Sequence, residues 1–232
     1  MSWRIDSDLL NLRLQTPWKK KVFAKGAFEK YVKTMEELKR QLNLECDRTL
    51  SPEEWDMLLS LSIEVHLKNK EVLIEPGQVD KDVYIVKEGI MRGVYFEGTQ
   101  ERTFAFGMPG TIFMAAFSFY RDEPSYYQIE ACCDSVVLRV PREQYIALAD
   151  RYHRFAVWAL HYSWSENYLG EIRDATVRNG TAEERWLQIL KRPMLVEKVS
   201  QRIIASYLNV TPEHLSRVKS NLLRKNKKGG VC

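Results

Sequence analysis

The side chains best suited to read a nucleic acid lie near the C-terminal end, from Glu213 to Arg217. Arg can donate two hydrogen bonds to guanine, and Glu can accept one from cytosine. Lys219, Arg224 and Lys225 follow on the same segment and suit phosphate groups. These residue types, taken together, favour contact with a DNA major groove.

The residues around this segment predict two short helices that position it. Ile204 and Leu208 predict the apolar face of the first helix, and Ala205 is small where a second helix would cross closely. Asn209 stands where the chain must turn, because Asn tolerates the left-handed conformation better than most residues. Thr211–Glu213 is typical of a helix start, with a capping hydroxyl, a proline and an acid near the positive end of the dipole. This spacing predicts a helix-turn-helix.

The exposed face of the second helix and its neighbourhood supply the expected DNA contacts. These contacts are Ser200, Thr211, Glu213, His214, Ser216, Arg217, Lys219, Ser220, Arg224 and Lys225. The alternative is an ordinary helical hairpin whose polar face is only solvated. Residues 214–232 hold six basic residues and no acidic residue, and phosphate neutralisation supplies most non-specific affinity for DNA. This basic tail favours DNA binding.

Charge is unevenly distributed along the 232 residues, whose formal net charge is +4. Residues 13–40 hold nine basic residues against three acidic ones, whereas residues 41–213 hold 19 basic against 26 acidic residues. An acidic middle between basic ends indicates a polyanionic partner.

Several other classes of protein are disfavoured. Cys46, Cys132, Cys133 and Cys232 show neither a Cys-x-x-Cys motif nor zinc spacing, so we expect reduced thiols, no metal and no cofactor. The histidines are too scattered for the metal centre of an enzyme built on a β-roll. No run of roughly 20 apolar residues is present, and the N-terminus lacks a secretory pattern. We therefore expect a cytoplasmic protein that is not an enzyme and makes no membrane contact.

The region between about residues 63 and 140 consists of short apolar runs separated by turn residues. Glu75-Pro76-Gly77 and Glu97-Gly98-Thr99 are two of these turn signals. Short strands at this spacing predict an antiparallel barrel, roll or sandwich. After Pro141 the apolar residues recur at helical spacing up to about Ile172. That length predicts one long helix, which usually needs a partner along its length.

The order of these elements resembles the cyclic-AMP receptor / fumarate–nitrate regulator (Crp/Fnr) family of transcription regulators over roughly residues 38–223. The segments that carry the resemblance are Glu75-Pro-Gly77, Tyr84-Ile-Val-Lys-Glu-Gly89, Arg92, Ala182-Glu-Glu-Arg-Trp-Leu187 and Ile204-Ala-Ser-Tyr-Leu-Asn-Val-Thr-Pro-Glu-His-Leu-Ser-Arg217. The last of these is similar to the recognition unit of the branch found in Bacteroidetes-type bacteria.

The resemblance implies an α+β fold with four parts. These are an N-terminal extension (1–35), an antiparallel β-roll effector domain with leading helices (36–141), a long dimerisation helix (142–178) and a helix-turn-helix domain (179–232). It also implies a homodimer, paired through residues 142–178, that reads a two-fold symmetric site on double-stranded DNA and contacts RNA polymerase. Glu213 and Arg217 fall at the family's main base-reading positions, and Pro212 stands where many members place another DNA-contacting residue.

The resemblance further implies a small-molecule effector in the roll, and here the sequence departs from the cyclic-nucleotide pattern. Members that bind cyclic AMP hold the ribose with a Gly-Glu pair and the phosphate with an Arg followed by a small hydroxyl residue. The corresponding stretches read Thr111-Ile-Phe-Met-Ala-Ala116 and Ser125-Tyr126-Tyr127. A buried phosphate without a cationic partner is costly, so we expect an effector other than cyclic AMP.

The residues expected around this effector pocket are Arg102, Phe113, Met114, Ala115, Arg121, Ser125, Tyr126 and Tyr127. Two alternatives stay open. One is a cyclic-AMP-responsive regulator in which a loop shift brings Arg121 to the phosphate. The other is a regulator-like protein that acts through protein contacts without binding DNA.

Overall fold

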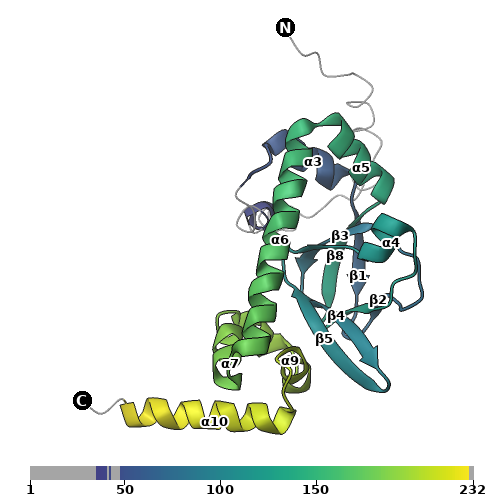
Figure 1. Ribbon diagram of the computed structural model, residues 1–232. Helices are drawn as coiled ribbons and strands as arrows, with labels where there is room; N and C mark the ends of the chain where they lie inside the picture. The colour runs from purple at the N-terminus through teal and green to yellow at the C-terminus, as the bar shows by residue number, and fades with distance from the viewer. Residues whose placement is uncertain (1–34, 41, 43–47, 230–232) are drawn as a thin grey trace, which may run out of the picture.

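The computed structural model describes residues 35–40, 42 and 48–229 (Figure 1). The expected N-terminal extension therefore lies outside the described residues, except for Met35. A β-roll lies beside a long helix, and a group of shorter helices lies at the far end of that helix (Figure 1). No helix in this described part of the chain is long and apolar enough to span a membrane.

The roll is made of two four-stranded antiparallel sheets, with strand orders β1-β8-β3-β6 and β2-β7-β4-β5. The strands are β1 (Ile63–Leu67), β2 (Val72–Ile74), β3 (Val83–Glu88), β4 (Met91–Glu97), β5 (Gln100–Gly107), β6 (Ile112–Phe113), β7 (Gln128–Ala131) and β8 (Ser135–Val140). Their apolar side chains meet between the sheets. The predicted antiparallel roll is confirmed.

Two glycines show why the chain turns where it does. Gly98 has φ +60° in the hairpin between β4 and β5, at the predicted turn signal. Gly89 has φ +86°, and a Cβ atom there would lie only 2.1 Å from the Ser135 Oγ. Any other residue at position 89 would be strained in its backbone and would clash with β8.

The described helices are α3 (Pro52–Ser60), α4 (Ala116–Arg121), α5 (Arg142–Arg151), α6 (His153–Asn179), α7 (Ala182–Leu190), α8 (Pro193–Lys198), α9 (Gln201–Tyr207) and α10 (Pro212–Gly229), and residues 35–40 and 42 are also helical. Capping boxes open α3 and α7, because Ser51 and Glu54, and Thr181 and Glu184, exchange hydrogen bonds at the first turn. Both boxes are visible in the sequence.

The prediction of one continuous helix over 142–178 is wrong. The chain breaks at Tyr152, which is extended (φ −120°, ψ 101°), and two helices, α5 and α6, result. The break lets α5 fold back so that the rings of Tyr145 and Phe155 lie 5.3 Å apart. A straight helix would leave these aromatic side chains without this packing, so burial of the rings outweighs helix continuity.

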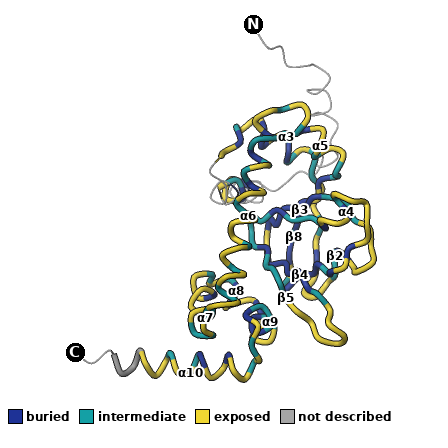
Figure 2. The backbone as a smooth tube through the Cα atoms, viewed as in Figure 1, coloured by how far each residue is buried: buried dark blue, intermediate teal, exposed yellow. Residues whose placement is uncertain are grey.

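Buried residues form three clusters (Figure 2). One joins α3, α5 and α6 to the roll and includes Trp55 and Trp158, whose rings meet edge to face at 5.5 Å. Another fills the space between the sheets. The third holds the C-terminal helices together and includes Ile90 and Cys132 of the roll. The C-terminal helices are therefore docked onto the roll.

Candidate nucleic-acid interface and roll cavity

Helices α9 and α10 cross over a small apolar core. Ala205 and Leu215 are fully buried at the crossing, and Ile204 and Leu208 complete the apolar face of the first helix. The turn between the helices contains Asn209 with φ +53°. The predicted left-handed turn and the predicted apolar pattern are confirmed. They leave the opposite side of α10 free to be polar.

Hydroxyl groups cap both helices. The Thr211 Oγ1 accepts a hydrogen bond from the His214 N–H at 3.1 Å, and the Ser200 Oγ accepts one from the Ile203 N–H at 3.4 Å. Hydrogen bonds from its own backbone N–H and from the Thr211 hydroxyl hold the pKa of the Glu213 carboxyl below its usual value. Glu213 is therefore ionised at neutral pH and available as a hydrogen-bond acceptor.

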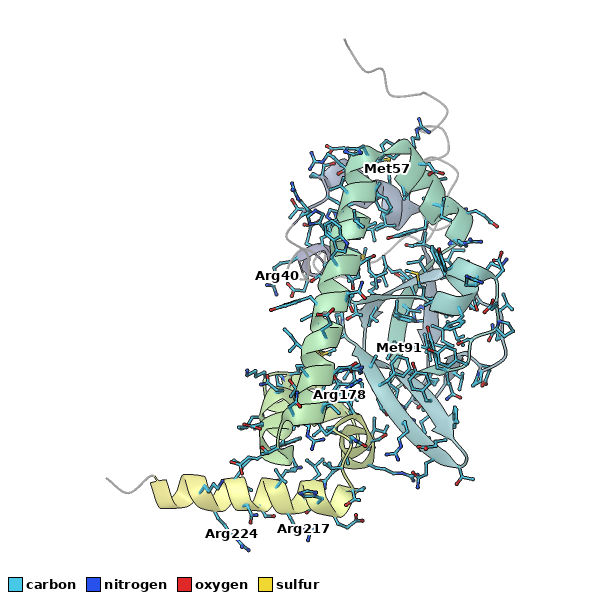
Figure 3. All side chains as sticks on the ribbon, viewed as in Figure 1. Arg40, Met57, Met91, Arg178, Arg217 and Arg224 are labelled. Atoms are coloured by element: carbon cyan, nitrogen blue, oxygen red, sulfur yellow. The ribbon has the colours of Figure 1, made fainter. Side chains whose placement is uncertain are left out.

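One face of α10 points away from the rest of the molecule. Glu213, Arg217, Ser220 and Arg224 are exposed and follow at intervals of four, three and four residues, which place them on one side of a helix. Figure 3 shows Arg217 and Arg224 extending from this side into solvent. His214 and Ser216 are also exposed. Side chains that can read bases and neutralise phosphates are thus gathered on one surface.

The two expected lysine contacts lie closer to the body of the C-terminal helices. The Lys219 Nζ lies 5.0 Å from the ring centroid of Trp186 and donates to the Gln201 Oε1 at 3.3 Å. The Lys225 Nζ donates to both carboxylate oxygens of Glu183 at 2.9 Å. These contacts hold α10 against α7 and α9. The Arg224 side chain makes no hydrogen bond or ion pair with any residue that the structure describes, so it is the freer cation.

A cavity of about 130 Å³ lies between the roll and α6. Three of the expected effector-pocket residues, Phe113, Met114 and Tyr127, line it. The other residues of its wall are Met91, Arg92, Gly93, Phe104, Ala105, Phe106, Gly107, Thr111, Ile112, Ile129 and Glu166. Sequence reasoning missed these because neighbouring strands and a distant helix bring them together.

Arg92 is the one basic residue in the described wall of this cavity, and its guanidinium is already occupied. It donates from Nε to Glu130 at 2.7 Å, from Nη2 to Glu101 at 2.7 Å and from Nη1 to Thr103 at 3.1 Å, and the residue is 5% exposed. Burial lowers the pKa of Arg92, but the two carboxylates outweigh burial and raise it. The sequence signal for this network was a glutamate inside the apolar strand β7.

Glu166 brings a carboxyl group to the same cavity from α6. Burial raises the pKa of Glu166, while a hydrogen bond with Tyr162 and the charge of Arg192 oppose that effect. Its spacing of four residues from the buried Tyr162 could have indicated that it faces the roll. The cavity thus offers apolar walls and one carboxyl group rather than a free cation.

The remaining expected effector-pocket residues do not line the cavity. Ala115 and Ser125 are buried beside it, and the Ser125 hydroxyl donates to the Tyr127 carbonyl at 2.7 Å. Arg121 is exposed, with its Nε 3.8 Å from Glu123. Tyr126 and Arg102 are also exposed. None of them belongs to the cavity wall.

Arg102 lies instead where the roll meets the C-terminal helices. Its Nη1 donates to the Asn209 Oδ1 at 3.5 Å. Beside it, the Ser206 hydroxyl donates to the Glu101 carbonyl at 2.9 Å and accepts from the Thr103 N–H at 3.0 Å. Strand β5 and helix α9 are thus joined by direct hydrogen bonds, and β5 also carries Glu101 of the Arg92 network.

The cysteines and the candidate metal ligands are the remaining groups that could do chemistry. Cys132 is buried and Cys133 half-buried, and both are free thiols. Burial raises the pKa of Cys132 to about 12. Cys46 and Cys232 lie outside the described residues. Within the part of the chain that is described, no three His, Cys, Asp or Glu side chains gather as a metal site would require.

Comparisons with known proteins agree with this geometry. Residues 64–152 match the family model of the cyclic nucleotide-binding domain, a stretch that runs from β1 to the end of α5. No curated protein matches the sequence.

Solved structures extend the likeness beyond the residues that the family model matches. FixK2 from Bradyrhizobium japonicum has a TM-score of 0.62 at 22% identity, over 71% of this chain and 86% of that chain. A variant of CooA from Carboxydothermus hydrogenoformans has 0.58 at 17% identity, over 72% and 78%. The c-di-GMP-responsive regulator CLP of Xanthomonas campestris has 0.57 at 13% identity, over 76% and 93%. The chain therefore has the fold of Crp/Fnr-type regulators.

Proposed function

We propose that this protein is a DNA-binding transcription regulator of the Crp/Fnr type. The observation that carries the proposal is the outward face of α10, where Glu213, Arg217 and Arg224 are exposed on one side of a helix held by its apolar opposite side. A recognition helix that enters the major groove needs this arrangement. The protein then works in the cytoplasm, where the DNA is, and is a regulator rather than an enzyme.

A homodimer paired through α6 is part of the proposal. This helix carries an exposed row of large apolar side chains, which are Leu160, Trp164, Tyr168, Leu169 and Ile172, each at least 41% exposed. Contiguous apolar surface of this kind marks an interface, and a second copy of the same helix is its natural partner. Pairing would set two α10 helices about 34 Å apart, one turn of DNA, on a two-fold symmetric operator.

We further propose that the effector of this regulator is a small molecule other than cyclic AMP. The support for this part is Arg92, whose guanidinium already binds Glu130, Glu101 and Thr103, so a phosphate there would have to compete with two carboxylates. A cyclic-AMP-responsive regulator, the alternative, would require Arg121 to leave the surface.

Regulation would act through the position of the C-terminal helices on the roll. An effector that binds one docked arrangement more tightly than another shifts the population between the two. RNA polymerase is a further proposed partner, and a regulator that acts through protein contacts alone is the competing possibility.

Selection from a random pool of DNA duplexes with the purified full-length protein tests the proposal. We expect enrichment of a two-fold symmetric sequence whose half-sites are about one helical turn apart. If no sequence is enriched and the protein binds DNA only non-specifically through charge, the protein-contact alternative is favoured and the assignment as a sequence-specific DNA-binding regulator is overturned.

A further inference from the structure

A second cavity, which we call the junction cavity, lies where the end of α6 meets α7 and α9. Its volume is about 250 Å³, about twice that of the roll cavity. Arg173 comes from α6, Arg185 from α7, Lys191 and Arg192 from the link between α7 and α8, and Tyr207 from α9. Figure 2 shows these helices gathered at one end of the molecule.

The junction cavity is strongly basic. Four of its lining residues are Arg or Lys, and none of the described lining residues is Asp or Glu. Cations gathered around a partly dehydrated space repel one another, and an anion in their midst relieves that repulsion. The roll cavity differs, because its one arginine in the described wall, Arg92, is already paired with the carboxylates of Glu130 and Glu101.

The cations of the junction cavity are only partly used within the chain. Arg173 pairs with the adjacent Asp174 at 3.1 Å. Arg192 interacts electrostatically with Glu166. The Lys191 ammonium group forms no hydrogen bond or ion pair with any residue in the described ranges. At least one full positive charge is therefore available to a ligand.

The remaining wall is mostly apolar, with Tyr207 as its aromatic residue and Thr176 and Gln188 as its neutral polar ones. Ile189 and Leu208 are buried behind the cavity, and the Arg173 guanidinium lies 5.9 Å from the Tyr207 ring centroid. A ring beside a guanidinium suits a flat organic body. Arginine forks and a lysine ammonium together suit a phosphate group. The combination favours an organic phosphate over a simple inorganic anion.

We propose that the junction cavity binds a small organic phosphate, a monoester with a flat apolar body. The site is distinct from the roll cavity, and its test does not require that the protein bind DNA. The Arg185 Nη1 donates to the Leu208 carbonyl at 2.5 Å, at the end of α9. A ligand held by Arg185 and Tyr207 therefore touches the helix pair directly and would bias its position relative to α6.

Titration calorimetry on the full-length protein at low ionic strength, without DNA, tests the proposal with two probe pairs. AMP and phenyl phosphate carry the phosphate, and adenosine and phenol are their uncharged counterparts. We expect both phosphates to bind at least about tenfold more tightly than their counterparts. Leu169 and Ile172 belong both to this wall and to the proposed dimer face, so the protein is used in its native assembly.

Variants locate the site. Lys191→Glu and Arg192→Glu should each weaken AMP binding at least about tenfold. Lys198→Glu makes the same charge change as Lys191→Glu at an exposed position of α8 outside the cavity, and should leave AMP binding within about twofold of the wild type.

Three results would overturn the proposal. If AMP and adenosine bind with equal affinity, the phosphate group contributes nothing to binding and the site is not a phosphate site. AMP that binds Lys191→Glu as tightly as the wild type occupies another site, the roll cavity included. If Lys191→Glu and Arg192→Glu instead weaken duplex binding and reduce its salt dependence while AMP shows no binding, these cations serve the DNA backbone.

Discussion

Arg217 and Arg224 lie on the same exposed face of α10. Because they lie at different positions along the helix, we expect Arg217 to contact bases and Arg224 to contact phosphates. Arg217 is one turn from the helix start, where recognition helices contact base edges. We expect Arg217→Ala to lose about 1–3 kcal/mol of discrimination between the selected operator and unrelated DNA. Fluorescence anisotropy with both duplexes measures this difference.

Arg224→Ala should act on all sequences alike, because a phosphate contact carries no sequence information. We expect a uniform loss of affinity and a salt dependence that is shallower by about one counterion. Anisotropy titrations at several salt concentrations measure the slope. If each of the two variants lowered the affinity for the operator and for unrelated DNA by the same factor, Arg217 would not contribute to sequence discrimination. The assignment of base contacts to Arg217 and phosphate contacts to Arg224 would then be wrong.

Cys132 gives a prediction independent of DNA. Burial raises the pKa of this thiol to about 12, so at pH 8 it stays protonated, and the thiolate is the reactive form. We expect iodoacetamide to spare Cys132 in the folded protein and to modify it after unfolding in urea, as read by peptide mass spectrometry. Rapid modification of Cys132 in the folded state would show that the core joining roll and C-terminal helices opens readily.

At the scale of elements, the sequence predicts the features that depend on interactions between residues close together in the chain. The capping residues Ser51 and Thr181, the left-handed Asn209 and the alternating strands each depend on neighbours a few residues away. The break at Tyr152 and the Arg92 network depend on packing between distant segments. The spacing of apolar residues along the chain does not show which distant segments contact one another. For this reason the sequence predicted one long helix and did not identify most residues of the roll cavity.

The contact between β5 and α9 is the element-scale feature most open to test. The Ser206 hydroxyl forms hydrogen bonds with two backbone groups of β5, the Glu101 carbonyl and the Thr103 N–H. Without this hydroxyl, both groups must bond to water or lose their hydrogen bonds. We expect Ser206→Ala to weaken docking by about 1–2 kcal/mol and to speed hydrogen exchange in α9 and at Thr103.

Ser220→Ala is the matched control, because that hydroxyl donates within α10 to the Ser216 carbonyl and takes no part in docking. Equal exchange rates in Ser206→Ala and the wild type would mean that the Ser206 hydroxyl does not hold the C-terminal helices on the roll, and that other contacts, such as the 4.8 Å contact between the Phe106 and Tyr207 rings, do so.

At the scale of the whole molecule, the account requires two copies joined through α6. Trp164 is 55% exposed in the middle of the apolar row, so Trp164→Glu would place a charge in the interface. We expect the dimer to weaken by about 3 kcal/mol or more, and operator affinity to fall with it. Sedimentation equilibrium measures the dimer directly.

Tyr120→Glu is the control for this experiment, because Tyr120 is 79% exposed on α4, away from α6. It should leave the dimer intact. A wild-type protein that sediments as a monomer at micromolar concentration, or a Trp164→Glu variant that dimerises as well as Tyr120→Glu, would remove α6 as the interface.

The central claim is that the outer face of α10 lies against a DNA duplex, and photo-crosslinking from that face measures this most directly. A photoreactive amino acid replaces Ser216, which is exposed on α10, or, as a control, Lys198, which is exposed on α8. The account predicts efficient crosslinking of the selected duplex from position 216 and little from position 198. Crosslinking that is absent at 216, or equal at both positions, would contradict it.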